Sequence, residues 1–169
     1  MAYDLNLDIA RLLKDEPFFA ALSRRIEKIS TNSIPTAAVG LNREAMQYEF
    51  LYNPEFFDKL TEQQRRGVII HEFYHLVFRH VSNRRPAQVI RDPQQYFKLW
   101  NIATDLSINC LIGADNLPEN CCIPGGKGFE DFPTMEGAEF YFREILDKVE
   151  NDPNGGDGVN GEGQFDDHG

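Results

Sequence analysis

The strongest constraint on the fold of this 169-residue chain is the run GVIIHEFYHLVFRH, which holds three of its four histidines. An α-helix turns about 100° per residue, so side chains four positions apart lie on one face of it. His71 and His75 would therefore point the same way, one turn apart, with Glu72 beside them. The apolar residues of the run surround most of the helical cylinder, so we expect a buried helix.

The beginning of this helix is marked in the sequence. Thr61 is followed three residues later by Gln64, which is the pattern of a capping box. Glu62 is favourable beside the positive end of the helix dipole. We therefore expect the helix to run from about residue 62 to residue 81, with His80 near its C-terminal end.

The HExxH spacing of residues 71–75 is the zinc-binding pattern of metallopeptidases. Each buried polar group without a partner would cost about 2 kcal/mol or more, and zinc removes this cost for imidazole nitrogens by binding them directly. The alternative is a pair of core histidines satisfied by protein groups. We predict that His71 and His75 bind zinc and that Glu72 is the general base acting on a zinc-activated water in peptide hydrolysis.

A catalytic zinc site needs a third protein ligand and keeps one position open for water. The next expected helix, residues 96–112, carries Asn101, Asp105 and Asn109 at four-residue spacing, as a polar stripe on an apolar helix. Asp105 is the charged member, so we predict it as the third ligand. Asn101 and His80 remain alternatives, although His80 lies about 140° from His75 on a regular helix and would point away.

The remaining pattern predicts an α+β domain over residues 1–150. We expect helices at 5–13 and 17–29, a hairpin of strands 37–41 and 45–52, a long loop at 114–133 and a last helix capped by Thr134. If the second strand lay at a sheet edge, it could pair with an extended peptide. Residues 151–169 hold six glycines and five acidic residues, so we expect a disordered tail.

The bulk composition excludes several classes of partner and points to a compartment. A net charge of −10 argues against nucleic acid and anionic membranes as partners, and no apolar stretch approaches the roughly 20 residues that span a bilayer. The N-terminus lacks the pattern of a secretory signal. Three cysteines without CxxC spacing indicate reduced thiols. We therefore expect a cytoplasmic protein.

Several spaced motifs also resemble a known family. The segments YNPEFFDKL, IIHEFYHLVFRH and NIATDLSIN, followed by LPENCCIPGGKGFEDF and GAEFYF, are similar to the metallopeptidase domain often found ahead of a von Willebrand factor A-like domain in bacterial and phage proteins. The resemblance covers residues 39–146. It implies a zincin-like fold, mainly helical with a small sheet beside the HExxH helix. It also implies His71, His75 and Asp105 as Zn²⁺ ligands, with Glu72 as the catalytic residue.

The resemblance has further implications for partners and location. It implies a peptide or protein substrate, an AAA-type ATPase as partner, and the host cytoplasm if the protein is phage-encoded. No von Willebrand A-like domain follows in this chain, and its end, FDDHG, resembles the start of the linker into that domain. In the related gluzincin pattern, ExxxD, Asn101 would replace the ligand and Asp105 would only orient a zinc histidine.

A second class of function fits the same residues. The domain could be a catalytically inactive module that zinc stabilises and that binds peptides or a partner, for example together with an AAA-type ATPase. Structural zinc sites usually have four protein ligands, whereas catalytic sites keep one position open. A fourth protein ligand would therefore favour the binding module.

Overall fold

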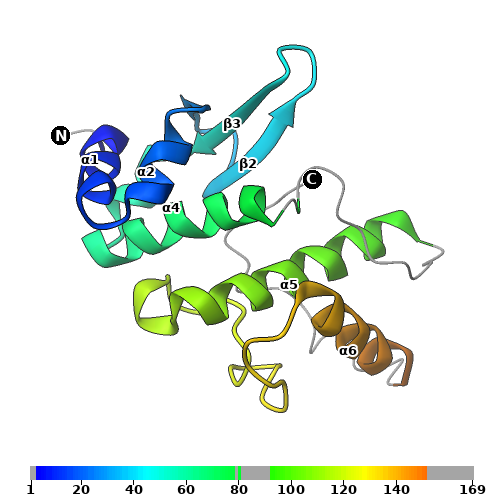
Figure 1. Cartoon of the computed structure of the whole chain (residues 1–169). Helices are drawn as coiled ribbons and strands as arrows, with labels where there is room; N and C mark the ends of the chain where they lie inside the picture. The colour runs from blue at the N-terminus through cyan, green and yellow to red at the C-terminus, as the bar shows by residue number, and fades with distance from the viewer. Residues whose placement is uncertain (1–2, 79, 81–91, 152–169) are drawn as a thin grey trace. The chain divides into compact units, whose positions relative to one another are not determined.

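The computed structural model describes residues 3–78, 80 and 92–151. Within these residues it is an α+β protein, as predicted, and it has six α-helices and one three-stranded sheet (Figure 1). In chain order the elements are α1 (Leu5–Asp15), α2 (Pro17–Ser23), β1 (Ile26–Ser30), β2 (Ala37–Asn42), β3 (Gln47–Tyr52), α3 (Pro54–Asp58), α4 (Glu62–Val77), α5 (Pro93–Ile112), the 3-10 turn η1 (Ala114–Asn116) and α6 (Ala138–Asn151).

The described residues form two compact units. The first comprises residues 3–78, 80 and 115–118, and the second comprises residues 92–114 and 119–151. The prediction of one domain over residues 1–150 stays a prediction, and the predicted disordered tail lies, apart from Asn151, outside the described residues.

The sheet of the first unit has the strand order β1-β3-β2. β2 and β3 form the predicted antiparallel hairpin, with Ala37 opposite Tyr52, and β1 runs parallel to β3. α4 packs against β2 and against α1 and α2, and the side chains between these elements make the core of the unit. Its members include Leu5, Leu12, Phe19, Ala37, Val39, Phe50, Phe57, Val68, Ile69 and Phe73.

Polar contacts also fix α4 within the first unit. The Asp8 side chain on α1 is buried and accepts hydrogen bonds from Tyr3 Oη at 2.7 Å and from Arg65 Nε on α4 at 2.9 Å. At the start of α4, the capping box is present as predicted: Gln64 N donates to Thr61 Oγ1 at 3.2 Å, and Thr61 N donates to Gln64 Oε1 at 3.0 Å. The helix that carries the histidines is therefore held at its first turns by side chains as well as by its core face.

The structure differs from the sequence analysis of the first unit at two places. The helix expected over 17–29 ends at Ser23, and Ile26–Ser30 is instead strand β1. Ile26 and Ile29 have helical spacing, but both are β-branched and here pair in register with Tyr48 and Leu51 of β3. The suggestion that β3 could pair with a peptide required an edge position, but β3 is the central strand, because β1 occupies its second side. It is therefore not available to pair with a peptide.

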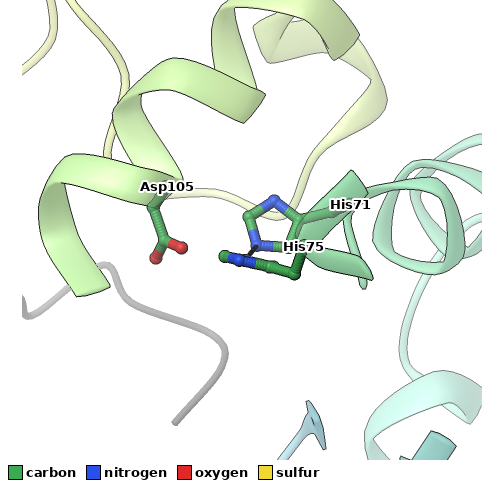
Figure 2. Close-up of side chains that lie close together, drawn as sticks. All are labelled: His71, His75 and Asp105. Atoms are coloured by element: carbon green, nitrogen blue, oxygen red, sulfur yellow. Dashed lines mark hydrogen bonds between the residues drawn. The ribbon is translucent and has the colours of Figure 1, made fainter. Parts of the chain in front are cut away.

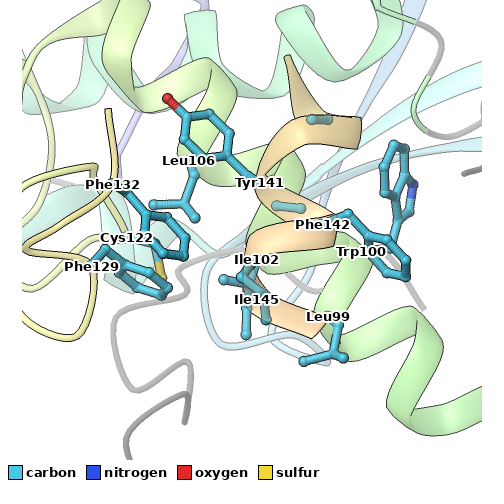
Figure 3. Packing of buried hydrophobic residues seen from close by; sticks show 12 residues of the cluster. Leu99, Trp100, Ile102, Leu106, Cys122, Phe129, Phe132, Tyr141, Phe142 and Ile145 are labelled. Carbon is cyan, nitrogen blue, oxygen red and sulfur yellow. The ribbon is translucent and has the colours of Figure 1, made fainter. Parts of the chain in front are cut away.

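The second unit is built on the long helix α5, which packs against α6. The buried side chains of the two helices meet those of the loop before α6 in one cluster (Figure 3). The cluster consists of Leu99, Trp100, Ile102, Ala103, Leu106, Cys122, Phe129, Phe132, Ala138, Tyr141, Phe142 and Ile145. Of the three cysteines, Cys122 is buried, and Cys110 and Cys121 are partly buried.

The hydroxyl of Tyr141 makes two hydrogen bonds to the backbone of the loop before α6. Tyr141 Oη donates to Pro133 O at 2.8 Å and accepts from Glu136 N at 3.2 Å. α6 begins at Ala138, so the prediction that Thr134 caps this helix is wrong. Met135 has a φ of 63°, which is not helical, and the Gly137 carbonyl accepts from Phe140 N at 3.0 Å and from Tyr141 N at 3.3 Å.

Gly67 of α4 provides a test of packing in the first unit. A Cβ at this position would lie 1.7 Å from the backbone oxygen of Asn116, whose side chain also accepts a hydrogen bond from Gln63 Nε2 at 2.6 Å. Gly67→Ala should therefore lower the free energy of unfolding by about 3 kcal/mol, because the backbone of 115–118 must move. In an open helix the same change would be stabilising by roughly 1 kcal/mol.

Urea unfolding monitored by circular dichroism measures this effect. Gly40→Ala is the matched control, since nothing lies within 4 Å of a Cβ at Gly40. We expect its midpoint to stay near that of the wild type. A Gly67→Ala midpoint equal to that of Gly40→Ala would contradict the observed packing of residues 115–118 on α4.

Candidate metal centre

His71 and His75 present their ring nitrogens to each other on one face of α4, as the spacing predicts. The two Nε2 atoms are 2.9 Å apart, the ring centroids are 4.7 Å apart, and neither side chain is exposed. Two nitrogens that each lie about 2.0–2.1 Å from one zinc ion can be at most about 4 Å apart. The observed separation satisfies this condition, so both lone pairs can be directed at a single cation.

The local sequence explains why this pair is buried. On the remaining surface of α4, Val68, Ile69 and Phe73 are buried in the core of the first unit. Glu72 lies next to His71 along the helix, and its side chain is also fully buried. α4 therefore places two imidazoles and one carboxylate away from water, where electrostatic interactions are stronger than in bulk solvent.

Asp105 lies on α5 in the polar stripe that the sequence predicts. Asn101, Asp105 and Asn109 are all buried, so this stripe does not face bulk water. Asn109 Nδ2 donates to Cys122 O at 2.7 Å, which gives Asn109 a structural role in the second unit. The N-terminus of α5 is fixed by Asp92, whose side chain accepts from Gln94 N at 2.9 Å. Asp105 is thus a buried carboxylate on a well-anchored helix.

The predicted ligands form a group that could hold a metal ion. Each of His71, His75 and Asp105 offers one ligand atom, and these atoms all lie within 4.8 Å of one another (Figure 2). In the described part of the chain, no other group of three or more histidine, cysteine, aspartate or glutamate side chains meets this condition. Two imidazoles and one carboxylate form a donor set typical of catalytic zinc.

His80 does not point away from His75 as a regular helix would require. α4 ends at Val77, four residues before the predicted end, and Phe78 is its C-cap. His80 Nδ1 lies 3.1 Å from His75 Nδ1. This contact was missed because no glycine or proline marks the end of the helix in the sequence.

Tyr74 lies in a different environment on the same helix. Its ring packs edge-on against Phe19, with centroids 5.1 Å apart, and stacks on Phe78 at 5.4 Å. Burial, with a smaller effect from the Glu16 carboxylate, raises the pKa of the Tyr74 hydroxyl above its ordinary value. Tyr74 therefore stays protonated at neutral pH and serves in packing within the first unit.

Comparison with known proteins agrees with the class of protein that these features suggest. An α+β domain with an HExxH helix and a buried His-His-Asp group belongs among candidate metallopeptidases. A family model described as "Putative metallopeptidase domain" matches residues 1–164, and the chain belongs to this family. No curated protein and no solved structure matches the chain. Among the described helices, none is long and apolar enough to cross a membrane.

Proposed function

We propose that this domain is a zinc-dependent endopeptidase with a zincin-like fold. His71, His75 and Asp105 would hold the ion, and Glu72 would be the general base. The observation that carries the proposal is the pair of buried imidazoles on one face of α4, whose Nε2 atoms lie 2.9 Å apart, with the buried Glu72 carboxylate beside them. Membership of a family described as a metallopeptidase domain supports the same activity.

The donor set fits zinc. Neutral imidazole nitrogens and a carboxylate oxygen are all zinc ligands, and three protein ligands leave a fourth position for water or substrate. The same set also suits Fe²⁺, so the residues beside the ligands help to distinguish the two ions. The Glu72 carboxylate directly after the first histidine is the residue that an HExxH zinc peptidase requires, and it favours zinc.

Zinc and Glu72 would have separate roles in the proposed peptide hydrolysis. When bound, zinc supplies a Lewis acid that polarises the peptide carbonyl and lowers the pKa of water. Glu72 Oε accepts a proton from the attacking water and later delivers it to the leaving amine nitrogen. Burial of Glu72 excludes bulk water from this proton transfer. His71 and His75 would stay neutral so that each keeps a nitrogen lone pair for the ion.

The sheet of the first unit offers a place for an extended peptide. β2 pairs with β3 on one side only in the described sheet, and it packs beside α4, which carries His71 and Glu72. An exposed strand edge can bind a peptide by main-chain hydrogen bonds. We therefore assign to the outer edge of β2 the peptide-binding role that the sequence pattern suggested for β3.

A peptide-library assay tests the proposed activity. The purified protein, loaded with zinc, should cleave members of a mixed peptide library, and mass spectrometry of the products would locate the cleaved bonds. A chelator should stop cleavage, and added zinc should restore it. Zinc binding without cleavage of any peptide would instead support the alternative, a zinc-stabilised module that binds peptides or a partner such as an AAA-type ATPase.

A further inference from the structure

His80 lies three residues beyond the end of α4 at Val77 and is hydrogen-bonded back to that helix. His80 N donates to His75 O at 2.9 Å, and Phe78 N donates to Tyr74 O at 2.9 Å. A hydrogen bond that spans five residues in this way is part of the Schellman arrangement of helix C-termini. A side-chain contact between the residue that donates this hydrogen bond and the residue that accepts it frequently accompanies that arrangement. Here those two residues are His80 and His75.

The two nitrogens of the His75 ring have different neighbours. Nε2 lies 2.9 Å from Nε2 of His71, whereas Nδ1 lies 3.1 Å from Nδ1 of His80. Nδ1 and Nε2 of an imidazole ring point outward in widely different directions, because Cε1 separates them. Nδ1 of His80 therefore approaches the His75 ring from a different side than Nε2 of His71 does.

Burial and ring packing hold His80 in this place. Its side chain is 5% exposed, and its ring centroid lies 5.2 Å from that of His75 and 5.8 Å from that of Phe78. The backbone hydrogen bond from His80 N to His75 O fixes the same pair from the main chain. The position of His80 relative to His75 is thus set by three kinds of contact within the first unit.

If His75 binds a cation through one ring nitrogen, its other ring nitrogen must carry the proton, so only one tautomer of His75 is possible. A neutral imidazole has one N–H and one lone pair. When the lone pair of His75 is on Nε2, its proton is on Nδ1, and Nδ1–H can donate to Nδ1 of His80. His80 then carries its own proton on Nε2. An outer group that accepts from a metal-binding histidine fixes its tautomer and ring orientation.

We propose that His80 is a positioning residue for the zinc ligand His75, acting through the Nδ1–H···Nδ1 hydrogen bond. This role rests on the proposed zinc site and assigns His80 a place outside the ligand set. Loss of such an outer hydrogen bond typically weakens metal binding by about 10–100-fold. His80 is therefore expected to affect zinc affinity without touching the ion.

Two variants of nearly equal shape separate the hydrogen bond from packing. His80→Asn keeps an acceptor near the place of Nδ1, whereas His80→Leu has similar volume and no acceptor. Zinc affinity is measured by competition with a chelating dye, and Tyr74→Phe serves as a control because Tyr74 packs against Phe19 and Phe78. We expect about 10–100-fold weaker zinc binding in His80→Leu, and near wild-type binding in His80→Asn and Tyr74→Phe.

Cobalt substitution provides a second readout that packing alone would not change. The visible absorption of Co²⁺ bound to His80→Leu should differ from that of the wild type, and that of His80→Asn should match it. Equal zinc affinity and equal spectra for the Asn and Leu variants would overturn the role of His80. Absence of zinc binding in the wild type would overturn the proposed zinc site itself, and the role of His80 with it.

Discussion

Glu72→Gln should leave zinc bound while it lowers the rate of peptide hydrolysis by about 10²–10⁴-fold. The amide has almost the shape of the carboxylate, so the buried site should keep its packing. It cannot accept a proton from water, however, and the step that Glu72 is proposed to perform would be lost. The measurement is kcat/KM on a cleaved library peptide, with the zinc content of the same sample determined in parallel.

Glu62→Gln is the matched control for this experiment. It makes the same chemical change in the first turn of the same helix, at a side chain that is 62% exposed and pairs with Arg11. Its activity should be near that of the wild type. If zinc-loaded Glu72→Gln hydrolysed the peptide at the wild-type rate, Glu72 would have no part in the reaction.

His75→Ala should abolish zinc binding and the stabilisation that comes with it. A ligand that binds only the folded protein stabilises it by about 2.7 kcal/mol at a free concentration of 100 Kd. For a chain of this size, that corresponds to a rise in Tm on the order of 5–10 °C. Wild-type protein should show this rise when zinc is added to the metal-free form, and His75→Ala should show none.

The thermal experiment also has a matched control. Val77→Ala shortens a side chain at the end of the same helix, and Val77 is 38% exposed. This variant should keep the zinc-dependent rise in Tm. An equal rise in His75→Ala and Val77→Ala would mean that zinc binds elsewhere on the chain.

Helix α4, which carries the HExxH residues, was the most predictable part of the fold, since its signals are local. The capping box at Thr61 and the apolar residues around the cylinder determine where α4 begins and that it is buried. The HExxH spacing puts His71 and His75 on one face whatever the tertiary structure is. The polar stripe on α5 could likewise be predicted from spacing alone, and the role of Asp105 as a ligand stays a prediction.

The features that were not predictable depend on contacts between distant residues or on the end of a helix. β1 was expected to be helical, because Ile26 and Ile29 match a helical period, and only pairing with β3 makes this segment a strand. The central place of β3 follows from the same pairing. His80 meets His75 because α4 ends at Val77, and no glycine or proline in the sequence marks that end.

The most direct test of the proposed centre is the metal content of purified wild-type protein and of Asp105→Ala, measured by multi-element mass spectrometry after dialysis. We predict about one zinc per chain in the wild type, because two imidazoles and one carboxylate suffice for a catalytic zinc site, and much less in Asp105→Ala. Iron in place of zinc, or no metal after zinc is added, would contradict the zinc site. Full zinc in Asp105→Ala would exclude Asp105 as its third ligand.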